Sequence, residues 1–355
     1  MIIPVNTAIK EDDLYYKNDN TTVSKGYRGL NLFGKIKFSS IIASSLWEVH
    51  SFHRKTLKKR ECYIGPFWGE FGNFLLHFLP YIVYLHKRGI KLNLCCLENY
   101  IPFLTDEKGN KIYAESVSLR DFFKEMRPTA NTVNPPEDVY RQYLGFKQKA
   151  EKSGLPFLDL SKADLYWYIF RNWQLHGKQD SYHLEKVYKK NSESSGNNAV
   201  IFPRKKGTGY TLNNGEAWNY MEVAKSISPY FDKVFITGHP SMSADVYEAD
   251  NIKLCLSANN TVIMGCCANS NLIITQHSGA MHLGSYFNVP VLVIFKGNLP
   301  IKGLDDSIRF IKNIQRQNIY IALHKEEIVN FVREKLYIAK PAAVMPAGLI
   351  NSGMK

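Results

Sequence analysis

The chain has 355 residues, of which 45% are hydrophobic and 22% are charged. A chain of this length buries about 75% of its unfolded surface, so it needs no disulfide or metal for stability, and its composition excludes collagen, a coiled coil and global disorder. Lys and Arg number 45 against 32 Asp and Glu, which gives a net charge of +13. This surplus favours polyanionic partners, namely nucleotides, phosphates, nucleic acid or an anionic membrane face; a generally Lys-rich proteome is the alternative.

The cysteines and the apolar stretches bear on the cellular compartment. The six cysteines show neither C-x-x-C nor zinc-finger spacing, which argues against a structural zinc site and favours buried thiols in a reducing compartment. The first residues, MIIPVNTAIKEDD, lack the basic and apolar regions of a signal peptide. The longest uncharged stretch, 254–295, contains too many Asn, Ser, Gln and His residues for a membrane helix. We therefore expect a cytoplasmic protein, either free or peripheral at a membrane.

Residues 1–60 give the weakest secondary-structure signal. We expect an N-terminal extension that packs in part on the first domain and holds one strand within 35–49. The basic run over 54–60 is interpreted as a solvated edge, with contact to an anionic membrane surface as the alternative.

A clear β-α-β unit follows. We expect a strand over 61–68, a glycine turn over 69–72, a helix over 73–88 and a second strand over 91–97. Such tight loops predict a parallel pair of strands with a right-handed crossover.

The next hundred residues are mixed. Helices are expected over 119–126, 138–154, 163–176 and 183–191. The polar run 192–198 is interpreted as a domain boundary, so that the first α/β domain covers 61–195.

Strands and helices then alternate regularly. The expected strands cover 199–205, 233–240, 252–257, 271–275 and 289–295. The expected helices cover 216–230, 243–248, 260–269, 280–287 and 325–338. This pattern predicts a second, doubly wound α/β domain over 196–323, with a C-terminal helix and tail over 324–355. Because ligands of parallel sheets bind at the carboxyl ends of the strands, we expect a cleft between two facing carboxyl edges.

The turn after strand 271–275 is the first candidate site. Ser278 can cap the following helix, Gly279 lets a ligand approach the backbone, and Ala280 opens the first helical turn. Unpaired N–H groups at a helix start form a natural phosphate cradle. His277 and His282 flank this turn; an ordinary capped strand-to-helix turn is the alternative.

Two further strand ends of this domain carry cationic groups. Arg204 and Lys205 lie in the Pro-Arg-Lys loop that ends strand 199–205, where they can neutralise a diphosphate, Arg204 in a bidentate manner. His239 follows the strand that begins at 233 and can contact a phosphate or a sugar. Exposed loop charge is the alternative for each.

The glycine turn of the first domain is the acceptor-side candidate. Glu70, between Gly69 and Gly72, can accept a proton from a hydroxyl nucleophile. His77, one turn into the helix, is a competing base, or else a packed helix histidine. No Walker A loop, dinucleotide fingerprint, nucleophile elbow or D-x-D metal motif is present in the sequence, so no metal cofactor is expected.

At these residues the sequence resembles GT-B glycosyltransferases, most of all heptosyltransferase-like enzymes. In that family a strand leads into Asp-Ser-Gly-x-Met-His, a helix and a Val-Pro strand, and the segment 270–297 matches it at Ser278, Gly279, Met281 and His282, with His277 at the Asp position. The segment 69–80 resembles the glycine loop that opens the N-terminal half, with Asn73 in place of Asp. The same loop also resembles that of GT-B fucosyltransferases.

The resemblance implies two Rossmann-like domains facing across a cleft, the GT-B fold. It implies transfer of a sugar from a nucleotide-sugar to a hydroxyl of a glycan or lipid-linked glycan, without a metal and as a step of polysaccharide biosynthesis. The first domain would hold the acceptor, through the loop of Gly69, Gly72 and Asn73, with Glu70 or His77 as the base. The second would hold the donor diphosphate on Arg204, Lys205 and the amides of 278–280, with His239, His277 and His282 contacting the donor or its sugar.

Three other functions stay open at this point. A pyruvyl-type transferase that modifies polysaccharide would use the same scaffold, and a degenerate fold could act as a lectin. A basic polyanion- or nucleic-acid-binding protein would use the net charge alone. The absence of RNP, helix-turn-helix and zinc motifs from the sequence argues against nucleic acid as a partner.

Overall fold

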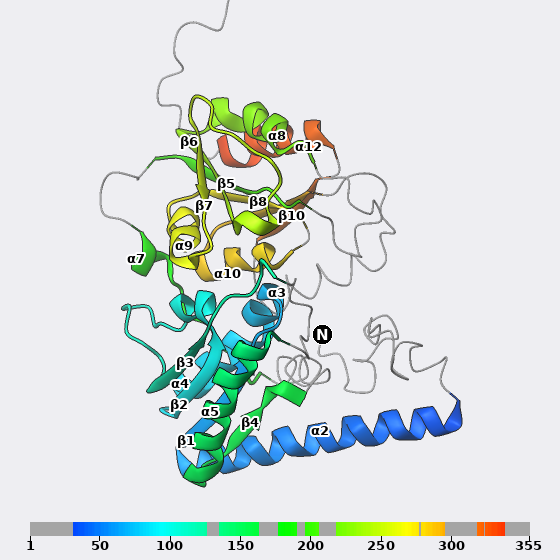
Figure 1. Ribbon diagram of the computed structural model, residues 1–355. Coiled ribbons are helices and arrows are strands. Elements are labelled where there is room, and N and C mark those ends of the chain that lie inside the picture. The colour runs from blue at the N-terminus through cyan, green and yellow to red at the C-terminus, as the bar shows by residue number, and fades with distance from the viewer. Residues whose placement is uncertain are drawn as a thin grey trace, which may run out of the picture.

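The computed structural model describes residues 31–125, 135–162, 177–189, 196–205, 218–276, 278–294, 318–322 and 324–337. Within these ranges the chain forms two sheets, one after the other along the sequence (Figure 1). Every pair of neighbouring strands in both sheets is parallel. Helices connect the strands, so the expected α/β class with parallel sheets is confirmed.

The first sheet has the strand order β3-β2-β1-β4. Its strands are β1 Glu61–Phe67, β2 Lys91–Leu97, β3 Glu115–Leu119 and β4 Phe157–Asp159. All residues of β1 and β2 except the first of each are buried, as expected for parallel strands covered on both faces. The predicted β-α-β unit over 61–97 is confirmed, because β1 and β2 pair in parallel.

One helical run connects β1 to β2, and shorter pieces follow it. The run consists of α3 Phe71–Asn73, a π-helical segment Phe74–Phe78 and α4 Leu79–Lys87. The later pieces are a 3₁₀ segment Glu98–Phe103, α5 Glu137–Ser153, a 3₁₀ turn Leu160–Lys162 and α7 Glu185–Tyr188. The predicted helix over 138–154 is α5, and the one over 183–191 is reduced to the single turn α7 within the described residues.

The second sheet has the strand order β10-β9-β8-β5-β6-β7. Its strands are β5 Asn198–Phe202, β6 Lys233–Gly238, β7 Ile252–Leu256, β8 Leu272–Thr275, β9 Val291–Ile294 and β10 Ile319–Ala322. Its helices are α8 Tyr220–Ile227, α9 Asn260–Ala268, α10 Leu283–Phe287 and α12 Lys325–Phe331. Short helical segments cover Ser228–Tyr230, Pro240–Met242, Gly279–His282 and Val332–Tyr337.

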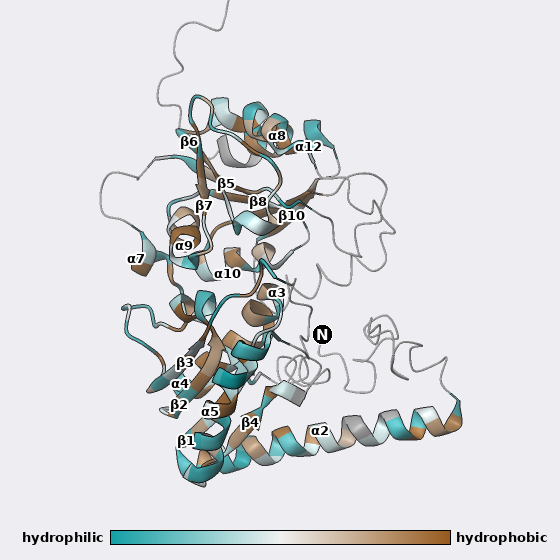
Figure 2. Cartoon of the chain, in the orientation of Figure 1, coloured by the Kyte–Doolittle hydropathy of each residue, from teal (hydrophilic) through white to brown (hydrophobic). Residues whose placement is uncertain are grey.

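Alternate residues of the second sheet enter two different cores. Val200, Ile273 and Val293 point into the core that is shared with the first sheet, α9 and α10. Their neighbours Ile201 and Ile274 point the other way, into a separate core with α8 and α12. The second sheet is therefore doubly wound, and hydrophobic residues gather on its strands (Figure 2).

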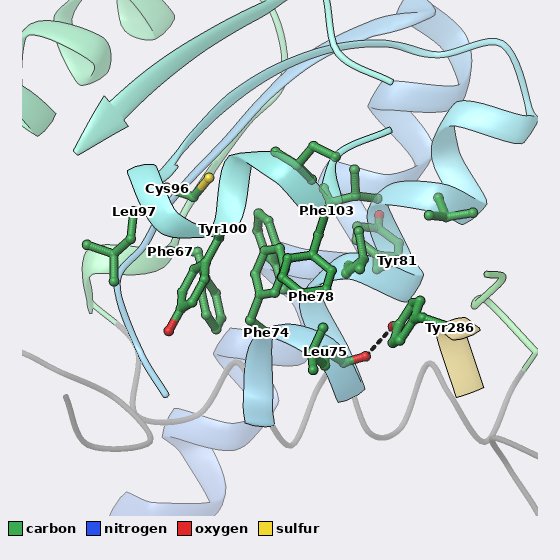
Figure 3. Close-up of a cluster of buried hydrophobic side chains, with 14 of the residues drawn as sticks. Phe67, Phe74, Leu75, Phe78, Tyr81, Cys96, Leu97, Tyr100, Phe103 and Tyr286 are labelled. Carbon is green, nitrogen blue, oxygen red and sulfur yellow. Dashed lines mark hydrogen bonds between the residues drawn. The ribbon is translucent and has the colours of Figure 1, made fainter. Parts of the chain in front are cut away.

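An aromatic cluster underlies the start of the helical run after β1 (Figure 3). The rings of Phe74 and Tyr100 stack with centroids 4.5 Å apart, and those of Phe67 and Phe78 lie 4.8 Å apart. Each such pair contributes about 0.5–1.5 kcal/mol beyond the area it buries. This packing fixes the place where β1 ends and the glycine turn begins.

Hydrogen bonds join the two halves. The Tyr286 hydroxyl, from α10, donates to the Leu75 carbonyl oxygen, as Figure 3 shows. The Asn260 amide, at the start of α9, donates to the carbonyl oxygen of Asn99. These bonds and the shared core hold the carboxyl ends of both sets of strands against each other.

The strand expected within 35–49 is wrong, because that segment lies within the helix α2, Leu32–Lys59. Val49, Phe52, His53 and Thr56 are buried, at the i, i+3, i+4 and i+7 spacing of one helix face, where α2 lies along β1 and β4. Towards its N-terminus α2 extends away from the rest of the described chain (Figure 1). None of the helices within the described residues has the length and apolarity that crossing a membrane requires.

Two other local predictions are also wrong. Residues 119–125 are not helical: Leu119 ends β3, a strand whose serines conceal it in the sequence. The helix expected over 243–248 is absent, and only the 3₁₀ turn Pro240–Met242 precedes that segment. The helix expected over 163–176 lies outside the described residues.

Candidate active site

Three neighbouring strands of the second sheet end at one edge. β8, β5 and β6 are adjacent and parallel, with Phe202 opposite Thr275 and Ile201 opposite Ile236. The residues that follow them therefore lie side by side. This edge brings together the Ser278 turn, the Arg204 loop and His239, as the sequence predicts for a ligand site at the carboxyl ends of the strands.

The turn after β8 forms a 3₁₀ segment, Gly279–His282, that leads directly into α10. Ser278 stands at the capping position but makes no capping bond, so its predicted role as a cap is wrong. Its backbone is extended, and its hydroxyl lies instead 3.0 Å from the Thr275 hydroxyl. Ala280 and His282 are buried, and His277 lies outside the described residues.

The glycine turns of the two halves touch each other. A Cβ placed on Gly279 would lie 2.6 Å from the Gly72 nitrogen and 3.2 Å from the Phe71 carbonyl carbon. A Cβ placed on Gly72 would lie 3.1 Å from the Gly279 Cα and 3.8 Å from the His282 ring. Backbone packs on backbone here, so a Cβ at Gly279 would force the turns apart whether or not a phosphate also binds, whereas one at Gly72 would require a smaller shift. The donor-side and acceptor-side turns of the sequence prediction therefore meet in one place.

Packing holds the acceptor-side turn in position. The buried hydroxyl of Tyr100 donates to the Gly69 carbonyl oxygen over 2.8 Å, and the Glu70 carbonyl oxygen accepts from the Phe74 N–H at the start of the helical run. Burial, and after it the negative charges of Glu70 and Asp121, raise the pKa of Tyr100 well above its ordinary value. Glu70 and Asp121 therefore both lie close enough to Tyr100 for their charges to act on its hydroxyl.

The two candidate bases lie in different surroundings. Glu70 is half-buried, at the position before α3. His77 is only 2% exposed, inside the π-helical segment that packs into the core. The sequence left both residues open as the base; the difference in access favours Glu70, because a base must reach a substrate hydroxyl. Asn73 ends α3 and is half-buried.

The loop after β5 is tied to the loop after β6. The Lys205 N–H donates to the Met242 carbonyl oxygen over 2.9 Å, and the Ala244 N–H donates to the Pro203 carbonyl oxygen over 2.5 Å. Arg204 is half-buried, whereas Lys205 is exposed. These bonds fix the backbone that carries both cations at the carboxyl edge.

An acid–histidine pair joins the two edges. The His239 Nε2 lies 3.0 Å from the Asp121 Oδ2, and its Nδ1 lies 2.7 Å from the Ser241 hydroxyl. Asp121 follows β3 of the first sheet, and its N–H donates to the Glu98 carboxylate over 3.0 Å. Both ring nitrogens of His239 therefore have protein partners, and a ligand that binds beside this ring contacts a histidine that is already paired with Asp121.

The first edge is rich in carboxylates, and the cations among them are paired: Arg120, directly after β3, with Glu125 and Asp138, and Lys147 with Asp159. Each strand of the first sheet is followed, or in one case ended, by a carboxylate; these are Glu70, Glu98, Asp121 and Asp159. Burial alone would raise the pKa of Asp159, but hydrogen bonds from Ser161 and Tyr143 outweigh burial and hold that pKa below its usual range. The second edge presents Arg204 and Lys205. Across the part of the chain that the structure describes, no three His, Cys, Asp or Glu side chains gather as a metal site would require.

Sequence reasoning missed three of these carboxylates. Glu98 directly follows the predicted strand 91–97 and could have been found from that position. Asp121 was hidden because its strand, β3, was interpreted as helix. Asp159 ends β4, a three-residue strand too short to leave a pattern.

Comparisons with known proteins show low similarity. No protein-family model matches the sequence, and no curated protein matches it. The chain is similar to a glycosyl transferase family 9 structure from Veillonella parvula, at 10% identity over 77% of this chain and 89% of that chain, with a TM-score of 0.48. It is similar to the E. coli heptosyltransferase WaaC with ADP-2-deoxy-2-fluoro heptose, at 10% identity over 79% and 100% of the two chains, with a TM-score of 0.47. At this similarity, the function has to be argued from this chain's own residues.

Proposed function

We propose that the chain is a glycosyltransferase that moves a sugar from a nucleotide-sugar to a hydroxyl of a glycan or lipid-linked glycan, without a metal ion. The observation that carries this proposal is the contact between Gly72 and Gly279. It joins the carboxyl edge of one parallel sheet, lined with carboxylates, to that of another, which carries cations. A transferase needs these two environments side by side, one to deprotonate an acceptor and one to stabilise a leaving phosphate.

The second edge supplies the groups that a nucleoside diphosphate requires. Arg204 and Lys205 would neutralise its charge, and the backbone N–H groups of 278–280 would hydrogen-bond its oxygens. Their loops are fixed by backbone bonds to the 242–244 segment and by the Gly72 contact. Such preorganised donors stabilise developing negative charge without reorganising during the reaction. His277 would contact the donor or its sugar, whereas the buried His282 lies beside the contact between Gly72 and Gly279.

The first edge supplies the base for an inverting reaction. Glu70 would accept the proton of the acceptor hydroxyl while that oxygen forms a bond to the anomeric carbon of the sugar. The bond from this carbon to the diphosphate oxygen breaks, and the nucleoside diphosphate leaves with the electron pair. Arg204 and Lys205 would hold the resulting charge. Gly69, Gly72 and Asn73 would shape the acceptor side of the turn.

A ligand screen on the full chain tests the proposal. UDP-, GDP- and ADP-sugars are compared with CMP-sugars, which lack a diphosphate, and the unfolding temperature is measured for each. A ligand at a hundred times its Kd stabilises the fold by about 2.7 kcal/mol. We expect one diphosphate-linked donor to raise the unfolding temperature and CMP-sugars to leave it unchanged.

Further ligands in the same assay, with a measurement of nucleoside diphosphate release, separate the alternatives. Stabilisation by phosphoenolpyruvate alone would indicate a pyruvyl-type transferase. Tight binding of double- or single-stranded nucleic acid that weakens steeply as the salt concentration rises, with no response to any nucleotide-sugar, would indicate a polyanion-binding protein. Donor binding without release of nucleoside diphosphate in the presence of glycan acceptors would indicate a lectin-like protein.

A further inference from the structure

The helix α2 presents large apolar side chains to solvent. Leu32 is 71% exposed, Phe33 82%, Ile36 58% and Trp47 68%. All four precede Val49, the first core residue of α2. The N-terminal part of this helix extends away from the two sheets (Figures 1 and 2). Such a group of exposed apolar side chains, unlike a scattered one, marks a surface that another molecule covers.

These side chains share one stripe of the helix. Phe33 and Ile36 stand three residues apart, and Trp47 lies eleven residues, about three turns, further along the same face. Ser40, Ser44 and Ser51 occupy the positions between, and Arg54 and Lys58 continue the face. At about 100° per residue, Trp47 lies about 180° from Thr56, in the face that packs on the sheet. The apolar stripe therefore points away from the protein, and cations continue it towards the attached end.

The charge of this segment selects the partner. Residues 31–60 contain seven Lys and Arg residues and a single carboxylate, Glu48, so that this segment carries +6 of the chain's +13. Lys37, Arg54, Lys58 and Lys59 are exposed. Two copies of such a helix would repel each other, whereas an anionic lipid surface is complementary to both the charge and the apolar stripe.

We propose that α2 is an interfacial helix that docks the protein on an anionic lipid bilayer. Phe33, Ile36 and Trp47 enter the boundary between headgroups and acyl chains, and Arg54 and Lys58 contact lipid phosphates. Aromatic rings such as that of Trp47 favour this boundary. The helix lies in the plane of the surface, because its Lys and Arg residues exclude a crossing. This inference does not depend on the sugar-transfer reaction.

Vesicle flotation of the full chain tests the docking. Vesicles of phosphatidylcholine with about 30% phosphatidylglycerol are compared with pure phosphatidylcholine. We expect binding to the anionic vesicles alone, and its loss when NaCl is raised from about 0.1 M to about 0.5 M. Loss of one cation lowers the affinity for anionic vesicles about fivefold, so the double variant Arg54→Gln with Lys58→Gln should bind roughly twenty-fivefold more weakly. Trp47→Ser weakens it at least tenfold, whereas Trp47→Phe keeps it and removes the fluorescence blue shift of that ring.

Matched controls lie on other surfaces. Lys152→Gln with Lys253→Gln removes the same charge from exposed positions outside α2, and Val262→Ser removes a 42% exposed apolar side chain from α9. Both should bind as the wild type does. The proposal would be overturned if wild-type binding did not depend on lipid charge or on salt. It would also be overturned if the α2 variants bound vesicles as tightly as these controls do. A dimer in sedimentation velocity that Trp47→Ser dissociates would overturn it too, because the stripe would then belong to a second copy.

Discussion

Substitution of Gly279 by Ala tests the contact between the two glycine turns. The added Cβ would lie 2.6 Å from the Gly72 nitrogen, where ordinary contact begins near 3.4 Å. The neighbour is backbone and cannot rotate aside, so the turns must separate by about 0.8 Å. Overpacking of this kind costs about 1–3 kcal/mol. A shift of about 1 Å at a reacting centre can also lower the transfer rate by about 10²-fold.

Urea unfolding and a transfer assay measure the two effects. Gly265→Ala is the matched control, because its Cβ meets nothing within 4 Å and the residue lies inside α9. That control should raise the free energy of unfolding by up to about 1 kcal/mol. Gly72→Ala, whose closest approach is 3.1 Å, should be milder than Gly279→Ala. If Gly279→Ala behaves like Gly265→Ala in both assays, the turns do not meet and the reasoning fails.

The remaining predictions concern the donor, the base, the metal and pH. Arg204→Ala should weaken nucleotide-sugar binding by about 1.5–3 kcal/mol in calorimetry, the contribution of a charged hydrogen bond; unchanged affinity would remove Arg204 from the site. Glu70→Gln should lower kcat by about 10²–10⁴ with donor binding retained, and a rate within about threefold of wild type would point to another base or to a retaining mechanism. Transfer should persist in EDTA, whereas strict dependence on Mg²⁺ or Mn²⁺ would place the donor elsewhere. Burial, and then the charge of Lys178, lower the pKa of His53 from 6.5 to about 4. Between these values the unfolded chain binds more protons, so the free energy of unfolding falls as the pH falls, by up to about 1.4 kcal/mol per pH unit. His53→Gln should flatten this slope in urea unfolding, and a slope as steep as that of the wild type would contradict the prediction.

Local pattern was enough to predict much of the fold. The strands β1 and β2 are continuous apolar runs next to glycine turns, a signal that depends only on nearby residues. The same reasoning found both glycine turns and the Arg204 loop, because parallel strands place their carboxyl ends at one edge.

The rest depends on tertiary packing. Helix α2 resembles a strand locally because Ile and Ser residues gather at 39–45, and only its burial against β1 and β4 shows which face matters. The half-polar strand β3 is stabilised by its pairing with β2, so the place of Asp121 beside His239 could not be inferred from its neighbours in sequence. Nor does any local signal place Gly72 against Gly279.

Hydrogen–deuterium exchange of the full chain, with and without the nucleotide-sugar found in the screen, tests the central claim most directly. The claim is that one site at the meeting of the two carboxyl edges binds the donor. We predict slower exchange at 203–205 and at 278–283, and also at 69–73, because Gly72 packs on Gly279. Donor binding that leaves all three segments unchanged, or that protects only residues away from these edges, would contradict the account.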